Sequence, residues 1–328
     1  MKRIIVLTFL ALFGFTAAQA QKQVAMLTHG ENTTVYYGSN ALVDAVAAAA
    51  SGDVINLSSG NFAAPPSSIE VTSLTIRGAG RYPDTALGVQ PTVISGGDMC
   101  LWADSLTFEG LHITGSVSCG NGTAHSQFID CFFEYIGTSG QFQISDCEFI
   151  QCNLKMENQP ISGSTFTNCV VIGEFGPNCV CNNCVMNAWN NDVVAYNSII
   201  TYRSPSTDPT YAINNNNLSN CVGIGVYYRN GYACFYSALS TSARAGNYSY
   251  AENEIFSSYL WRSGNYYYGI SYTLTAAAAA TYLGSDGTQV GVYGGMAPWG
   301  HSRGNKVTVP NQSRTDGKLE VTIQSVNQ

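Results

Sequence analysis

A short phrase recurs six times in the middle of this chain and constrains its fold more than any other feature. Each phrase opens with Asp or Asn, continues with Cys or Ser, and then has two residues that are mostly apolar. A unit this short cannot bury its apolar face alone, so its recurrence predicts a stack of similar units, a solenoid. The phrases begin at Asp130, Asp146, Asn168, Asn183, Asn197 and Asn220.

The spacing of the phrases indicates strands rather than helices. Successive Asp or Asn positions lie 16, 22, 15, 14 and 23 residues apart, whereas repeats of helix pairs are longer and more regular. Apolar and polar residues alternate ahead of the turns, as in Phe142-Gln143-Ile144-Ser145, which is typical of short strands. We therefore expect an all-β fold, a parallel β-helix solenoid. Asp and Asn suit its turns because they tolerate the left-handed backbone region, and stacked coils would align them in a ladder.

The chain has eleven cysteines, and five of them follow the Asp or Asn of the phrase. The total is odd, and five of the cysteines share one position of the repeat. Both observations favour core thiols in an interior column over a disulfide framework. One or two disulfides, for example at Cys119, Cys152 or Cys234, remain open. The three cysteines between residues 179 and 184 have no His nearby and no zinc-like spacing, so we expect no metal site.

The N-terminus has the parts of a secretory signal peptide, residues 1–20. Lys2 and Arg3 precede an apolar run over residues 4–15, and Ala18-Gln19-Ala20 is a small-x-small cleavage site. We expect cleavage near Ala20 and a secreted or periplasmic protein at the cell exterior. No apolar run is long enough for a membrane span.

Charge excludes one class of partner. Loss of Lys2 and Arg3 leaves 12 of the 14 basic residues against 21 acidic residues, a net charge of about −9. With only 11% charged residues, the chain lacks the basic footprint of a nucleic-acid binder. An acidic chain also repels anionic polymers. The sequence indicates no oligomeric state.

One helix is expected over residues 40–50, since Asn40 is a good N-cap and apolar residues follow at helical spacing. This N-terminal helix would cap the open end of the solenoid. No linker interrupts residues 21–298, so we expect one β-helix domain there. Residues 299–328 hold two alternating segments, 306–310 and 318–323, which we expect to be C-terminal capping strands.

Residues 51–62, with Gly52 and Asp53 in a turn before a strand, resemble the first coil of the pectin-lyase-like superfamily, including its secreted members of Bacteroidetes type, and residues 73–80 and 106–113 resemble its next coils. Residues 272–275 and 286–295 resemble its closing coil. The resemblance covers about residues 38–298 and implies a right-handed parallel β-helix. It implies no single activity, since the family includes lyases, hydrolases, epimerases and adhesins.

A lyase of this family would imply clustered carboxylates that hold Ca²⁺ and an Arg or Lys base, and a hydrolase would imply two or three converging Asp. The sequence contains no Asp-x-Asp, Asp-Asp, Arg-x-Lys or Gly-His-Gly group. This favours a binding or structural protein with a polysaccharide ligand and no cofactor. A polysaccharide lyase or glycoside hydrolase with an unrecognised site is the alternative, and a rod without a ligand is the third.

The segment 189–217 interrupts the repeat and combines aromatic, acidic and basic side chains with a run of Asn. Such side chains can hold a sugar by stacking and hydrogen bonds. A long polar turn is the competing interpretation. The candidate carbohydrate-binding residues are Trp189, Asp192, Tyr202, Arg203, Asp208 and Tyr211.

Overall fold

The computed structural model describes most of the repeat region and parts of the C-terminal region. The predicted signal peptide lies outside the described residues. These are residues 23–84, 88–120, 123–138, 144–157, 161–173, 175–188, 193–201, 218–224, 255–257, 271–295, 298–299, 305–308 and 322–325.

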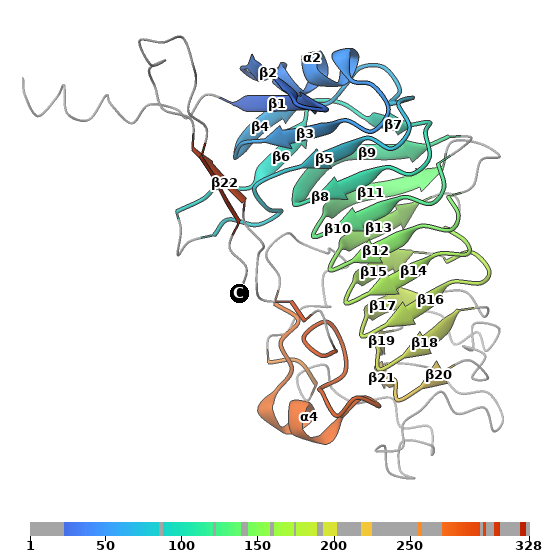
Figure 1. Ribbon diagram of the computed structural model, residues 1–328. Coiled ribbons are helices and arrows are strands. Elements are labelled where there is room, and N and C mark those ends of the chain that lie inside the picture. The colour runs from blue at the N-terminus through green and yellow to red at the C-terminus, as the bar shows by residue number, and fades with distance from the viewer. Residues whose placement is uncertain are drawn as a thin grey trace, which may run out of the picture.

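Two large sheets form the body of the protein (Figure 1). Sheet A contains, in chain order, β1 (Val24–His29), β2 (Asn32–Tyr37), β3 (Val54–Leu57), β5 (Thr75–Arg77), β8 (Thr107–Glu109), β10 (Gln127–Ile129), β12 (Glu148–Ile150), β14 (Thr165–Thr167), β16 (Val180–Asn182), β18 (Val194–Tyr196) and β20 (Leu218–Ser219). Sheet B contains β4 (Gly60–Ala63), β6 (Thr92–Ser95), β7 (Met99–Leu101), β9 (Leu111–Cys119), β11 (Phe132–Thr138), β13 (Asn153–Glu157), β15 (Val170–Gly173), β17 (Val185–Ala188), β19 (Ile199–Thr201) and β21 (Val222–Ile224).

Through most of its length the chain alternates between the two sheets, so successive coils lie directly above one another. Strand pairs are parallel throughout sheet B and from β3 onward in sheet A. The result is a parallel β-solenoid of about six turns with few helices, which confirms the fold class expected from the repeat. At one end, β1 and β2 form an antiparallel hairpin that continues sheet A. Two C-terminal strands, β22 (Asn305–Thr308) and β23 (Thr322–Ser325), pair with each other. The domain boundaries expected from the sequence remain predictions.

Successive coils turn twice at residues in the left-handed backbone region, where Gly, Asn and Asp are favoured. The first turn leads from sheet A to sheet B and has φ between 50° and 65° at Gly110, Asp130, Gln151, Asn168, Asn183, Asn197 and Asn220. The second turn precedes the strands β5, β8, β10, β12, β14 and β16 of sheet A and has φ between 50° and 62° at Ser73, Ser105, His125, Asp146, Gly163 and Asn178.

The prediction that all six phrases share one turn is therefore wrong for Asp146. This residue lies in the second turn, and Gln151 takes the corresponding place in the first. The phrase recurs at both turns because each has a left-handed residue followed by a buried residue that points inward.

The residue after the first turn forms the expected interior column of five cysteines. Each sulfur donates a hydrogen bond to a carbonyl of the coil before, as Cys152 Sγ does to Phe128 O at 3.1 Å. Cys152 belongs to this column, and Cys147 instead follows the second turn. The column consists of Cys131, Cys152, Cys169, Cys184, Ser198 and Cys221, all buried.

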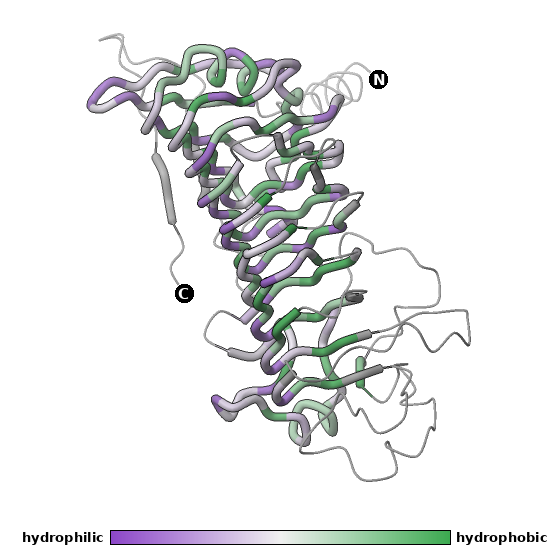
Figure 2. The backbone as a smooth tube through the Cα atoms, turned by 90° about the vertical axis from the view of Figure 1, so that its right-hand side faces the viewer, coloured by the Kyte–Doolittle hydropathy of each residue, from purple (hydrophilic) through white to green (hydrophobic). Residues whose placement is uncertain are grey.

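A second interior column consists of phenylalanines on the middle position of sheet A. Phe128, Phe149 and Phe166 stack face to face, with 4.8 Å between successive ring centres. This distance matches the spacing of neighbouring strands, so each coil adds one ring to a continuous core. Figure 2 shows apolar residues recurring on each coil in this way.

Within the described residues, two helices flank the solenoid. α2 (Ala41–Ala48) packs against β1 to β4 and buries Leu42 and Val46 in the main core. Asn40 occupies its N-cap position, but its side chain makes no capping hydrogen bond. α4 (Ala276–Thr281) is capped by Thr275, whose hydroxyl accepts from the Ala278 amide at 3.1 Å. Within the described ranges, no helix has the length and apolar character needed to cross a membrane.

The outer faces of the two sheets differ. Outward side chains of sheet A are partly or fully exposed on every strand from β5 to β18. On sheet B the outward Val170, Val185, Ile199 and Val222 are fully buried, because the segments at 255–257, 271–292 and Trp299 cover them. Figure 1 shows α4 beside the last coils. Segments 272–275 and 286–295, expected as a closing coil, thus pack outside the solenoid wall.

Candidate functional site

The six candidate carbohydrate-binding residues at 189–211 all lie outside the described residues, so that prediction stays untested. Tyr196 of β18, between Asp192 and Tyr202 in the sequence, is described and is 44% exposed. Its neighbours on the outer face of sheet A are Asn182 and Ser219. This aromatic side chain is therefore presented on an open, polar part of the sheet.

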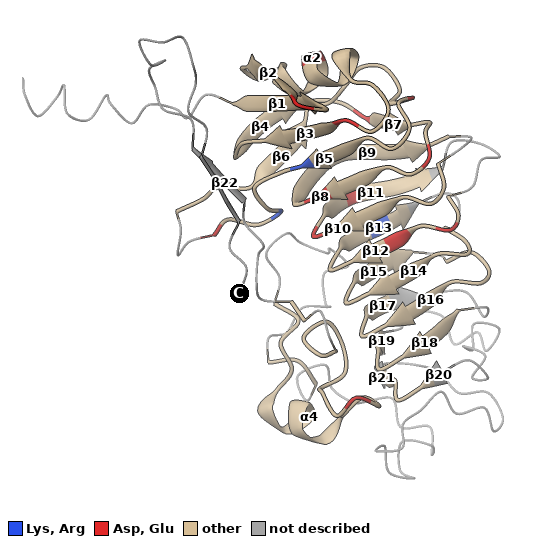
Figure 3. Cartoon of the chain, in the orientation of Figure 1, with Lys and Arg blue, Asp and Glu red and all other residues tan. Residues whose placement is uncertain are grey.

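Each strand of sheet A from β5 to β18 presents at least one hydrogen-bonding side chain on its outer face, in two rows that also contain Ile129, Ile150, Val180 and Val194. Arg77 of β5 donates from Nε to Glu109 Oε2 of β8 at 3.0 Å. Two strands further on, Gln127 donates from Nε2 to Glu148 Oε2, also at 3.0 Å. Both pairs are at least partly solvent-exposed. Figure 3 shows how few charged residues the coils carry, so these are distinctive features of the face.

This arrangement places two acids and a base on one face. Arg77 and Glu109 come from the adjacent strands β5 and β8, and Glu148 comes from β12, which β10 separates from β8. General acid–base chemistry on a glycosidic bond needs two carboxyl groups separated by less than about 10 Å. Local sequence patterns do not reveal this set, because its members are single residues in different repeats. The register pairs Arg77 with Glu109, and Glu148 lies in the neighbouring row, opposite Gln127.

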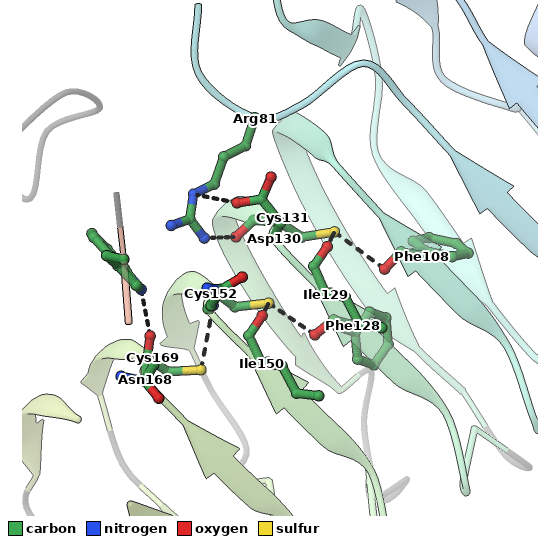
Figure 4. Close-up of polar contacts among 12 residues, drawn as sticks. Arg81, Phe108, Phe128, Ile129, Asp130, Cys131, Ile150, Cys152, Asn168 and Cys169 are labelled. Carbon is green, nitrogen blue, oxygen red and sulfur yellow. Dashed lines mark hydrogen bonds and ion pairs between the residues drawn. The ribbon is translucent and has the colours of Figure 1, made fainter. Parts of the chain in front are cut away.

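A buried ion pair joins the segment between β5 and β6 to the turn between β10 and β11 (Figure 4). Arg81 Nε lies 3.4 Å from Asp130 Oδ1, and both side chains are at most 10% exposed. Burial alone would lower the pKa of the Arg81 guanidinium, but Asp130 together with Tyr82, Cys152 and Cys169 more than offsets this, and the pKa is raised. Tyr82 and Trp299 face the same guanidinium, with ring centres 4.9 and 4.4 Å from its central carbon.

His112 lies on the outer face of sheet B, as the strand alternation predicts. It is only 8% exposed, and its ring meets Phe132 edge-on at 4.7 Å between centres. Burial lowers the pKa of His112 to about 4. The imidazole is therefore neutral at pH 7, inside a covered part of the protein.

The first-turn side chains hold a segment that we name the strap, residues 285–295 and 298–299. Asn168 Nδ2 donates to Val292 O at 3.0 Å and to Gly294 O at 2.6 Å. Asn197 Oδ1 accepts from the Ser285 amide at 2.9 Å, and Gln151 Nε2 donates to Pro298 O at 3.0 Å. The side chains of the expected ladder therefore bond mainly to the strap rather than to one another. One side-chain hydrogen bond joins neighbouring coils here, since Asn197 Nδ2 donates to Asn182 Oδ1 at 3.4 Å.

All ten described cysteines are free, so Cys119 and Cys152 form no disulfide, and Cys234 lies outside the described residues. Burial raises the pKa of Cys147 and of Cys179 to about 11. Within the described part of the chain, no group of three or more His, Cys, Asp or Glu could hold a metal ion. These thiols fill the core, as the repeat predicts.

Comparison with family models, with curated proteins and with solved structures found no match to this chain.

Proposed function

We propose that the protein is an exported β-helix scaffold that binds a polysaccharide along the open outer face of sheet A. The observation that carries this is the contrast between the two sheets. The last coils of sheet B, β15 to β21, are covered at their outward positions, whereas every strand of sheet A from β5 to β18 presents an exposed or partly exposed polar side chain, with Tyr196 near one end. A flat row of hydrogen-bonding groups beside an aromatic ring suits an extended sugar chain.

The charges on this face favour a neutral polysaccharide. Glu109 and Glu148 both lie on it, and the nearby Arg77 is already paired with Glu109. A polymer of uronic acids would meet uncompensated carboxylates and a negative net charge. Neutral sugars would instead exchange hydrogen bonds with Gln127, Asn182 and similar side chains.

A glycan panel with neutral and uronic-acid polymers tests this proposal. We expect retention of neutral polymers, and Tyr196→Ala should weaken binding about tenfold because the stacking surface is lost. Tyr196→Phe keeps the ring and should bind nearly as well. Trp102→Ala, which removes an exposed aromatic that is not on a strand of sheet A, is the matched control. Binding confined to uronic-acid polymers, or unaffected by Tyr196→Ala, would overturn the proposal.

A second candidate function, glycoside hydrolysis or lyase chemistry, is favoured by the shared face of Arg77, Glu109 and Glu148. The same glycans are incubated with the protein, and new reducing ends and ultraviolet absorbance of unsaturated products are followed. Activity that is lost in Glu148→Gln but kept in Gln127→Ala would support an enzyme. No product from any bound glycan would leave binding as the function. Ca²⁺ is added in a parallel series, since a lyase could use it.

We also propose the finer features of the fold and location. The Gly and Asp turn at 52–53 and the repeat support a right-handed β-helix similar to pectin-lyase-like proteins. The position of α2 beside the first strands supports a role as the N-terminal cap. Export follows from residues 1–20, and mass spectrometry of the mature N-terminus tests cleavage after Ala20.

A further inference from the structure

β2 is the terminal strand of sheet A. It pairs with β1 in an unbroken register from Val24 opposite Tyr37 to His29 opposite Asn32. No other described strand pairs with its second side. The Gly38 amide donates to Gln23 O at 2.8 Å. Because hydrogen-bonded pairs alternate in an antiparallel ladder, the backbone groups of residues 32, 34 and 36 face β1, and those of 33, 35 and 37 face away.

This edge lacks the features that usually protect a terminal strand. Proteins blunt open edges with Lys, Pro, charged side chains or bulges. The sequence of β2, Asn-Thr-Thr-Val-Tyr-Tyr, contains no charge and no Pro, and its register has no bulge. Four of its six residues are exposed, and Tyr37 is 53% exposed. An uncharged strand rich in β-branched and aromatic residues is therefore open for pairing.

We propose that β2 is an interaction surface for a second copy of this chain, joined by antiparallel pairing of the two β2 strands about a two-fold axis at Val35. In this register Val35 lies opposite its own counterpart, and Thr33 lies opposite Tyr37 of the other copy. The N–H and C=O groups of residues 33, 35 and 37 in one copy then face those of the same residues in the other copy, and about six hydrogen bonds form between the two strands.

A second copy fits this edge better than an unrelated peptide because the strand is complementary to itself. A two-fold interface places the same patch on both subunits, so any charge on it would meet a like charge. β2 carries none. Each Tyr37 ring would also lie across from a Thr33 side chain, a β-branched partner that aromatic residues favour across strands.

The pairing would join the two copies of sheet A into one continuous sheet. Residues directly opposite each other point to the same side of a sheet, so the outer faces of both copies would face the same way. The dimer does not depend on what those faces bind. A single added strand buries less than the roughly 1,200 Å² of a stable interface, so the association should be reversible and depend on concentration.

Sedimentation of the mature protein over a range from about 1 to several hundred micromolar tests the proposal. We expect a monomer that becomes a dimer as concentration rises. Val35→Pro removes an amide that faces away from β1, so it should preserve the fold but abolish the dimer. Val35→Thr keeps the amide and should dimerise as the native chain does. Circular dichroism and thermal unfolding verify that Val35→Pro is folded.

Cross-linking gives an independent readout. Opposed residues in a hydrogen-bonded pair are about 5.5 Å apart between Cα atoms, within the range of a disulfide. Val35→Cys should form a covalent dimer under mild oxidation, and the exposed Asp44→Cys on α2 should not. A monomer at every concentration, a dimer that persists in Val35→Pro, or equal cross-linking of the two cysteine variants would overturn the proposal.

Discussion

The guanidinium carbon of Arg81 lies 4.4 Å from the centre of the Trp299 ring, so an early coil of the solenoid is tied directly to the end of the strap. Trp299 Nε1 also donates to Asn168 O on a later coil. In a solenoid each coil otherwise contacts only its neighbours. Contacts that cross several coils make the separate units unfold together, which is the physical role we infer for the strap.

Removing one partner of the buried ion pair between Arg81 and Asp130 should strongly destabilise the protein. Arg81→Met leaves the Asp130 carboxylate buried without its partner, and we expect a loss of about 3–5 kcal/mol in the free energy of unfolding. Urea denaturation of the native and variant proteins measures this loss. Arg81→Met combined with Asp130→Asn should cost less than the two single variants together, because no buried charge remains.

The exposed pair on sheet A provides the matched control. Arg77, with its side chain 43% exposed, pairs with Glu109 at a similar distance. Arg77→Met should cost less than about 1 kcal/mol, since water solvates both charges. If Arg81→Met costs no more than Arg77→Met, the strap is not fastened through Arg81.

The Asn168 side chain should stabilise the protein through the strap as well as through its turn. Asn168→Gly keeps the left-handed backbone but loses the two hydrogen bonds to the strap, so it should cost about 1–2 kcal/mol. Asn168→Ala should cost about 1–2 kcal/mol more, because Ala disfavours that conformation. Asn178 has a similar φ of 62° but is exposed, and Asn178→Gly should stay within about 0.5 kcal/mol. Equal losses at the two sites would show that the strap contributes nothing.

The fold class could be predicted because a solenoid repeats one local requirement. Each turn has a left-handed residue and then a buried inward one, in the middle coils mostly Cys or Ser, and this leaves a visible phrase in the sequence. The same repetition hides the fact that Asp146 lies in the second turn and Gln151 in the first. Two turns per coil impose the same requirement, so the phrase alone cannot tell which turn a residue occupies.

The strap and the open face could not be read from local patterns. The bond from Asn168 to Gly294 spans more than a hundred residues, and neither residue signals the other. Alternation correctly predicts that His112 points outward, but outward does not mean exposed once another segment covers the sheet. The acids Glu109 and Glu148 likewise share a face only because the strands between them keep their register.

The cysteine column should be inert to thiol reagents until the protein unfolds. In a Cys234→Ser background, partly exposed Cys100 should react first, and the nine buried thiols should not react in the native state. With the pKa of the column thiol Cys221 raised to about 11 by burial, only about a thousandth of it is thiolate at pH 8. Titration with a disulfide reagent should count one thiol natively and ten in urea. Several fast native thiols, or none released on unfolding, would contradict the buried, reduced column.

His112 should make the protein lose stability as the pH falls. Burial lowers the pKa of His112 to about 4 in the folded state, against about 6.5 in the unfolded chain. Between these values the unfolded chain binds the extra proton, so the stabilisation is complete above pH 6.5 and is lost as the pH falls toward 4. His112→Phe cannot be protonated and fits beside Phe132. Urea unfolding at pH 7, 5.5 and 4 should show the native protein losing on the order of 2 kcal/mol more than His112→Phe. The carboxylates titrate in both proteins and cancel in this difference, so parallel pH profiles would mean that the folded protein accepts a charged His112 without cost.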